Sequence, residues 1–221
     1  MKRLHNSARG FTLVEVVISL SIAGVLSGIL FMVTYYFYAN MMQNNAATQM
    51  TLDTQIVLRS LTDDIRLADK IDSTNAITDA NQPSGWTTSN PSSILIISDP
   101  AVNSSNQIIY NPDTGYPYRN ENIYFVSSGT LYKRTLKNPD ATGNVAVTTC
   151  PPAIATSSCP PDKTFSTYVS SLQFSFHDAT DASTADATLA RSVDFTVAMS
   201  ATVYGRNMST SNSSRVTMRN Q

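Results

Sequence analysis

A carboxylate lies near the start of the longest apolar segment of the chain, and its position raises the first chemical question. From Phe11 to Ala39 the only side chain charged at neutral pH is Glu15, and the next charge along the chain is Asp53. A carboxylate at the centre of a bilayer helix costs about 2.5–3.5 kcal/mol on insertion scales. The chemistry open to Glu15 is therefore charge pairing, because a buried carboxylate needs a cationic partner or a position close to water.

The flanks of this segment indicate insertion into a membrane. Residues 1–10 hold three basic side chains and no acid, and the apolar run exceeds the roughly 20 residues that a spanning helix needs. Basic flanks stay in the cytoplasm, which predicts that the rest of the chain points outward. A cleaved secretory signal fits less well, because its apolar core has about 7–15 residues and ends at a small-residue cleavage site. An ordinary signal anchor explains the length but neither Glu15 nor Gly10.

The order Gly10-Phe11-Thr12-Leu13-Val14-Glu15 resembles the class III signal of type IV prepilins and type II secretion pseudopilins. The resemblance covers about residues 1–38 and combines a basic leader, the Gly, the Phe, the offset of the Glu and the apolar length. In that family a membrane prepilin peptidase cuts after the Gly and methylates the new N-terminal residue. The resemblance therefore implies cleavage between Gly10 and Phe11 and methylation of Phe11.

This resemblance also gives Glu15 an assembly role. Cleavage frees an α-amine at Phe11 that is largely protonated at neutral pH. In a bundle of subunits, Glu15 of one chain pairs with that ammonium on a neighbour, and an incorrect axial stagger leaves both charges buried and unpaired. The alternative is that Glu15 reaches the headgroups at the cytoplasmic face.

Small residues in the same segment suggest close helix packing. Gly24 and Gly28 form G-x-x-x-G, a spacing that lets helices approach closely, although small residues also occur there by chance. Many major pilins have Pro where this chain has Met32, and no Pro precedes Pro83. The uninterrupted segment favours a minor pilin or a pseudopilin over a major pilin.

Beyond residue 39 an amphipathic helix is predicted to continue to about Ile71. One apolar stripe recurs at three- and four-residue spacing, namely Leu52, Ile56, Val57, Leu61, Ile65 and Ala68. The alternative is a membrane helix and a separate head helix, broken near residues 40–45. The predicted organisation is a leader (1–10), a transmembrane and assembly helix (11–39), its amphipathic continuation (40–72), a β-rich head (73–205) and a polar, mobile tail (206–221).

The head is predicted to be an antiparallel sheet laid on the helix, which gives an α+β fold. Strands are expected at 92–98, 122–128, 131–136, 167–176 and 192–205, with a hairpin turn at Gly129-Thr130. The last strand alternates one apolar face with one polar face, as expected for a sheet covered on one side. The hairpin at 124–135 resembles the PilW and pseudopilin-J branch of the family.

Cys150 and Cys159 are the two cysteines of the chain, and each is followed by Pro-Pro. On the oxidising side of a membrane a disulfide between them persists, and closure of a loop this short contributes about 2–3 kcal/mol. Two free thiols remain the alternative. Two cysteines do not supply the four ligands of a structural zinc site.

Residue patterns for catalysis are missing from the sequence. Past the leader the one histidine is His177, and no G-x-S-x-G, H-E-x-x-H or phosphate-binding motif occurs. Asp178, Asp181 and Asp186 lack the glycine and glutamate pattern of an EF-hand, so a polar hairpin loop is expected there and no metal. We therefore predict no enzyme, no cofactor and, at a formal net charge of -1, no nucleic-acid partner.

The sequence thus predicts a structural subunit of a type IV pilus, and a minor one. Its expected partners are other pilin subunits, prepilin peptidase, a membrane assembly platform and, before assembly, the lipid bilayer. The expected location is the cytoplasmic membrane with the head outside, followed by the extracellular pilus. A minor pseudopilin of a type II secretion system, in a periplasmic pseudopilus, is the alternative. A membrane-anchored binding module that does not polymerise explains Gly10, Phe11 and Glu15 less well.

Overall fold

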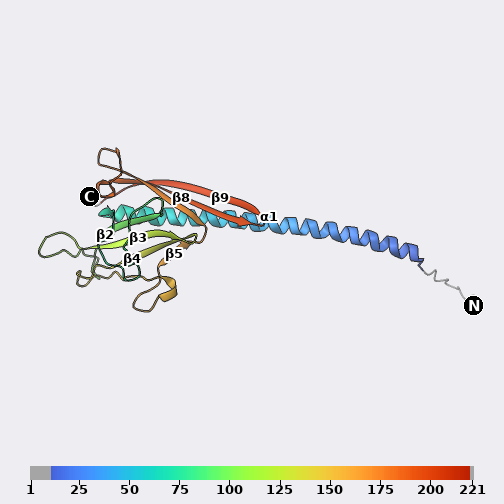
Figure 1. The fold of residues 1–221 in the computed structure, drawn as a ribbon, viewed down its shortest axis with the longest axis horizontal. Helices are drawn as coiled ribbons and strands as arrows, with labels where there is room; N and C mark the ends of the chain where they lie inside the picture. Colours follow the sequence, from blue (N-terminus) through green and yellow to red (C-terminus); the bar gives the residue numbers. More distant parts are fainter. Residues whose placement is uncertain (1–10, 220–221) are drawn as a thin grey trace, which may run out of the picture. The chain divides into compact units, whose positions relative to one another are not determined.

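The computed structural model describes residues 11–219 (Figure 1). A single long helix, α1 (Leu13–Leu67), is followed within these residues by antiparallel β-strands. The predicted α+β class is therefore confirmed. Internal contacts divide the chain into two compact units between Asn45 and Ala46, so α1 contributes its first part to one unit and its last part to the other.

The first unit contains helix that is apolar on every side. Every residue from Phe11 to Tyr38 is exposed, and the helix is long and apolar enough to cross a membrane by length and composition. The hydroxyls of Ser19, Ser21 and Thr34 each donate to the carbonyl four residues earlier, at 2.7–2.8 Å. These polar groups are therefore satisfied within the helix, as a lipid environment requires.

The second unit begins with the amphipathic part of α1. Its buried side chains are Met50, Asp53, Thr54, Val57, Leu61 and Ile65. The predicted stripe is correct from Val57 onward but wrong at Leu52 and Ile56, which are 50% and 56% exposed. The buried face of the helix instead runs from Val57 back through Thr54 to Met50, and Leu52 and Ile56 lie on a different side of the helix.

Helix α1 also ends earlier than the predicted Ile71. The backbone N–H of Asp69 donates to the carbonyl of Ser98 at 2.9 Å, and the next residues form strand β1 (Lys70–Asp72). Ile71 is fully buried opposite Ile97 in this strand pair. The helical spacing of apolar residues therefore continues beyond Leu67, where the helix ends, into residues that pair as a strand.

The first sheet of the head has the strand order β1-β2-β3-β4-β5. Its further strands are β2 (Ile94–Pro100), β3 (Arg119–Ser127), β4 (Thr130–Leu136) and β5 (Lys163–Ser166). The predicted hairpin joins β3 to β4, but its turn is Ser128-Gly129, one residue earlier than expected. Both turn residues have positive φ, 50° and 76°, as a two-residue type I′ turn requires.

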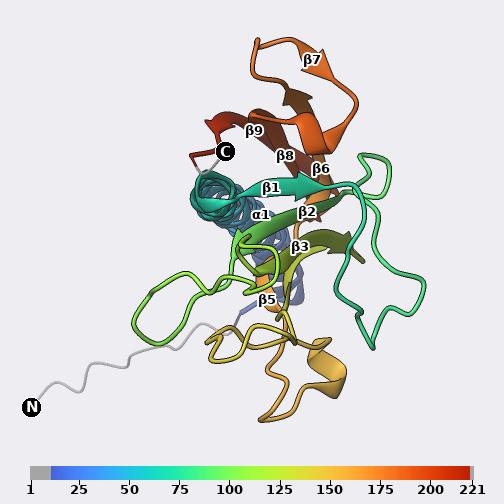
Figure 2. The same ribbon diagram turned by 90° about the vertical axis from the view of Figure 1, so that its left-hand side faces the viewer.

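The second sheet has the order β7-β6-β8-β9, so the head contains two antiparallel sheets where one was predicted. Its strands are β6 (Val169–His177), β7 (Ser183–Thr184), β8 (Ser192–Val203) and β9 (Arg206–Thr217). Short 3-10 turns occur at Pro152–Ile154 and Ala187–Leu189. Figure 2, which looks along α1, shows the strands of both sheets beside the C-terminal part of the helix.

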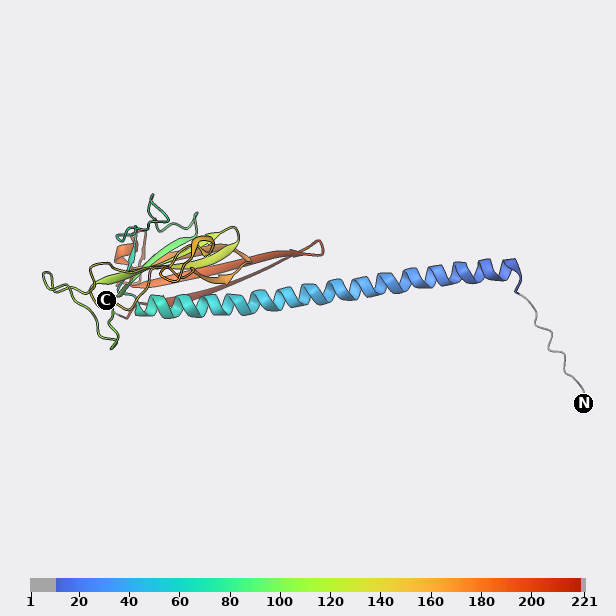
Figure 3. The same ribbon diagram turned by 90° about the horizontal axis from the view of Figure 1, so that it is seen from below.

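The prediction of a mobile polar tail is wrong for Arg206–Thr217. This segment forms β9, which pairs with β8 along its full length, and the two strands make a long hairpin (Figure 3). Tyr204 and Gly205 form the turn, both with positive φ. The composition of residues 206–217 did not indicate a strand, because these residues are mainly Ser, Thr and Asn and carry few apolar side chains.

One hydrophobic core joins the helix to both sheets. It contains Leu61 and Ile65 of α1, Tyr124 of the first sheet, and Phe195 and Val197 of the second. A smaller cluster, Trp86, Ile96, Ile123 and Leu136, covers the opposite face of the first sheet. Both faces of the first sheet are therefore buried, the outer one by loops.

Candidate functional site

The first turn of α1 is closed by reciprocal hydrogen bonds between Thr12 and Glu15. The backbone N–H and the hydroxyl of Thr12 both donate to Glu15 Oε2 at 2.9 Å, and the N–H of Glu15 donates to Thr12 Oγ1 at 3.3 Å. This is a capping box, in which Thr is the N-cap and Glu the third helical residue. The T-x-x-E spacing that signals a capping box is visible in the sequence, although only the charge of Glu15 was used to predict its role.

The capping box gives the Glu15 carboxylate partners within its own chain. It also places the negative charge at the helix N-terminus, where the aligned peptide dipoles favour an anion. Phe11 directly precedes the N-cap and is 84% exposed, whereas Gly10 lies outside the described residues. Glu15 thus lies in the first turn of α1, four residues beyond Phe11, the residue at which the new N-terminus is predicted.

The two glycines of the G-x-x-x-G pattern face open space. A Cβ added at Gly24 or at Gly28 meets no atom within 4 Å. Residues four apart lie on the same face of a helix, so the pair forms a shallow strip beside Ser21. Within the residues that the structure describes, nothing contacts a Cβ at either glycine, and the role of the strip in packing remains a prediction.

The comparison with protein families identifies this segment. The prokaryotic N-terminal methylation motif matches residues 5–31. The chain carries the N-terminal signal of the type IV pilin and pseudopilin family. No curated protein matches the chain. The matched motif is shared by the family and excludes the head, so the PilW and pseudopilin-J branch stays a prediction.

A run of aromatic residues ends the apolar part of α1. Tyr35, Tyr36, Phe37 and Tyr38 are all exposed, between 49% and 73%. Successive helical residues are rotated by about 100°, so these four point to all sides of the helix. Aromatic residues concentrate at membrane–water interfaces, and the polar Asn40 follows two residues after Tyr38. The run YYFY is therefore the sequence signal for such an interface at the end of the apolar segment.

In the head, Cys150 and Cys159 are joined by a disulfide. The loop that it closes is fastened at its base, where the N–H of Cys150 donates to the carbonyl of Pro160 and the N–H of Asp162 donates to the carbonyl of Cys150. Asn81 Nδ2 also donates to Cys150 Sγ at 3.4 Å. The disulfide therefore holds Asp162 and the segment around Asn81 close together.

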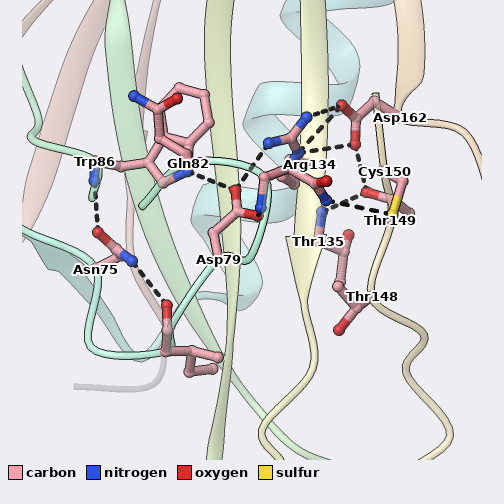
Figure 4. A network of polar contacts seen from close by, with 12 residues as sticks. Asn75, Asp79, Gln82, Trp86, Arg134, Thr135, Thr148, Thr149, Cys150 and Asp162 are labelled. Atoms are coloured by element: carbon pink, nitrogen blue, oxygen red, sulfur yellow. Dashed lines mark hydrogen bonds and ion pairs between the residues drawn. The ribbon is translucent and has the colours of Figure 1, made fainter. Parts of the chain in front are cut away.

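Asp162 belongs to a buried ionic cluster that the sequence analysis missed (Figure 4). Arg134 of β4 donates to Asp162 at 2.6 Å and to Asp79 at 2.8 Å, and the side chains of all three are at most 4% exposed. Burial alone raises the pKa of Asp79, but hydrogen bonds from Arg134 and Trp86 outweigh it and hold the pKa below its usual value. Burial alone lowers the pKa of Arg134, but its hydrogen bonds to Asp162 and Asp79 outweigh this effect and raise the pKa above its usual value.

The acidic residues of the β6–β8 connection all have protein partners. Asp178 accepts hydrogen bonds from Thr180 and Ala182, Asp186 caps the turn at Thr188, and Asp181 pairs with Arg215. Across residues 11–219 no group of three His, Cys, Asp or Glu side chains is placed to hold a metal ion. His177 lies at the end of β6, and its Nε2 is 2.9 Å from Asp194.

Proposed function

We propose that this chain is a minor subunit of a type IV pilus, inserted in the membrane as a prepilin and polymerised through its N-terminal helix. The observation that carries the proposal is the matched N-terminal methylation motif, which opens a helix that is apolar and exposed on every side. A helix of this kind needs lipid or other helices around it. A subunit that moves from a bilayer into a bundle of sister helices satisfies both conditions.

Processing is the first step of the proposed function. The basic leader keeps the N-terminus in the cytoplasm, and prepilin peptidase cuts between Gly10 and Phe11 and methylates Phe11. The apolar helix then spans the bilayer, with Tyr35–Tyr38 at the outer interface, and leaves the head outside. The Cys150–Cys159 disulfide suits that oxidising side.

Assembly is the second step. In the membrane the capping box supplies the Glu15 carboxylate with donors from Thr12. In the fibre the charged amine of Phe11 on a neighbouring subunit provides a stronger, ionic partner, which fixes the axial stagger. Gly24 and Gly28 allow close approach of a sister helix in the apolar part, and the exposed Leu52 and Ile56 offer a further contact on the head helix.

N-terminal processing and fibre incorporation together test the proposal. In the native host, mass spectrometry of the membrane-extracted protein is expected to find N-methylated Phe11 as the first residue. Gly10→Asp is expected to leave the leader attached and to remove the subunit from sheared fibres. An intact Met1 in the wild-type protein, or a cut after about residue 39, would contradict the proposal.

A minor pseudopilin of a type II secretion system is the second candidate. The continuous helix from Leu13 to Leu67 fits it as well as it fits a minor pilin, because many major pilins have Pro at the position of Met32. A deletion strain separates the two functions. Loss of surface fibres with normal export supports the pilus, whereas accumulation of secreted hydrolases in the periplasm supports the secretion system.

A further inference from the structure

A cavity of about 430 Å³ opens on the outer face of the first sheet, away from the main core. Its floor includes Phe125 of β3 and Tyr132 of β4. One wall is the segment Asn81–Gln82 from the β1–β2 connection, and another is Pro151–Pro152 from the disulfide loop. Its volume lies in the range of about 300–1,000 Å³ that is typical of small-molecule sites.

The floor of the cavity is a set of packed aromatic rings. Phe125 and Tyr132 are stacked with ring centroids 5.4 Å apart, and the Trp86 ring lies 4.7 Å from Phe125. Tyr132 is partly exposed, whereas Trp86 is almost buried and donates its indole N–H to Asp79 at 2.9 Å. Tyr132 is therefore the partly exposed end of an aromatic stack that Phe125 and Trp86 support from behind.

Arg134 fixes the two walls to each other (Figure 4). Its guanidinium bonds Asp79, which lies beside Asn81, and Asp162, which lies beyond the disulfide loop. It also stacks over Trp86 and Phe125, 5.4 and 5.5 Å from their ring centroids. The cavity is therefore formed before a ligand arrives, and binding does not have to order these loops.

The charges of the lining restrict the class of ligand. Within residues 11–219 Arg134 is the one cation that lines the cavity, and its donors are directed at Asp79 and Asp162. Asp162 also lines the cavity, and Asp79 lies behind Arg134, so the cluster of one cation and two carboxylates carries a net negative charge that disfavours phosphates and carboxylates as ligands. The remaining polar groups are neutral, namely the amides of Asn81 and Gln82 and the hydroxyls of Ser92, Ser127 and Tyr132.

We propose that this cavity binds a neutral saccharide. A pyranose ring has a flat C–H face that suits the partly exposed ring of Tyr132, and its hydroxyls both donate and accept, which suits the neutral amides and hydroxyls of the rim. The amide of Asn81 donates to the Cys150 sulfur, which is a weak acceptor. A sugar hydroxyl in its place would accept a stronger hydrogen bond from the same amide. The site adds surface recognition to the head, beyond the structural role of the N-terminal helix.

Trp86 is the only tryptophan of the chain, so its fluorescence reports on this cavity. The full chain, purified in a detergent without a sugar headgroup, is titrated with glucose, galactose and N-acetylglucosamine. At least one is expected to give a saturable change with a millimolar Kd. Tyr132→Ala is expected to weaken binding about tenfold, because it removes the stacking ring, whereas Tyr132→Phe keeps Kd within about twofold.

The control variant is Tyr116→Ala, which removes an exposed tyrosine outside the cavity and is expected to leave Kd unchanged. Three results overturn the proposal: no saturable change with any neutral sugar, saturation by a proline-rich peptide but by no sugar, or unaltered sugar binding by Tyr132→Ala. Tyr132→Phe guards against a trivial loss of folding. Fibre incorporation is measured separately, so failure of sugar binding leaves the pilus proposal intact.

Discussion

At the residue scale, one carboxylate has two possible partners, and two substitutions separate them. Glu15→Gln keeps a side chain that can complete the capping box with Thr12 but removes the charge, whereas Glu15→Leu removes both. Both variants are expected to enter the membrane and to be cleaved at least as well as wild type, because the charge penalty is gone.

Recovery in sheared fibres, measured against the membrane fraction, is expected to fall for both variants. The cause is the Phe11 ammonium of a neighbour, which is then buried without an anion. Head contacts of a minor subunit can leave some incorporation. Wild-type recovery of Glu15→Gln beside poor recovery of Glu15→Leu would assign Glu15 to capping alone, and wild-type recovery of both would show that the carboxylate serves neither role in assembly.

Asp99 gives the head a pH dependence that a single substitution removes. Burial raises its pKa from 3.8 to about 6, and nearby Asp64 adds to this, while Lys133 opposes it. Between about pH 4 and pH 6 the folded protein keeps a proton that the unfolded chain releases, so the contribution of Asp99 to stability falls as the pH rises through this range.

Asp99→Asn stays able to accept the hydrogen bond from Asn122 and no longer ionises. We expect this variant to raise the free energy of unfolding by about 1–2 kcal/mol at pH 7 and to leave it almost unchanged near pH 4. The expected gain at pH 7 is limited because solvent screens part of the effect at this partly buried position. Urea denaturation at both pH values measures this. The control is Asp140→Asn at an exposed acid, and an equal gain at both pH values would argue against titration of Asp99.

At the scale of elements, the disulfide loop and the loop between β1 and β2 depend on each other. Cys150 and Asp162 are joined by a backbone hydrogen bond, and Asp162 pairs with the Arg134 that also holds Asp79. Replacing both cysteines by Ser is expected to lower the free energy of unfolding by about 2–3 kcal/mol. Denaturation followed by Trp86 fluorescence measures it, and the wild-type protein is expected to show no reactive thiol before reduction. A change under about 0.5 kcal/mol would mean that the ionic cluster alone holds the loop.

The parts of the fold that could be predicted are those with a local pattern. The N-terminal methylation motif was recognisable because its residues lie close together in the sequence, and the apolar helix and strand β8 have strong periodicity. Strand β9 escaped because its Ser, Thr and Asn residues are stabilised by pairing with β8, which the composition does not reveal. The exposure of Leu52 and Ile56 was not predicted, because apolar residues lie on two sides of that part of α1. Which side is buried depends on where the sheets pack.

The ionic cluster escaped for a related reason. Asp79, Arg134 and Asp162 come from three separate segments, and nothing in their local sequence links them. Their meeting depends on the hairpin of β3 and β4 and on two covering loops. The cavity beside them depends on the same contacts, so a local reading of the sequence detects neither.

At the scale of the whole molecule, the division between Asn45 and Ala46 predicts where the chain can be cut. The first core residue of the head is Met50, and residues before 46 contribute exposed apolar helix. A protein of residues 46–221 is therefore expected to be soluble and folded, with the Cys150–Cys159 disulfide formed. Size-exclusion chromatography, a cooperative thermal transition and a thiol assay test this expectation.

A deeper cut supplies the matched control. Residues 59–221 lack Met50, Thr54 and Val57, which are fully or almost fully buried between helix and sheets. Loss of each large core side chain costs about 2–5 kcal/mol, and a domain of this kind has about 5–15 kcal/mol in total. The shorter protein is therefore expected to aggregate or to lose its cooperative transition. If residues 59–221 fold as well as residues 46–221, the first turns of the head helix are not part of the core, and the boundary of the head lies further along α1 than the structure places it.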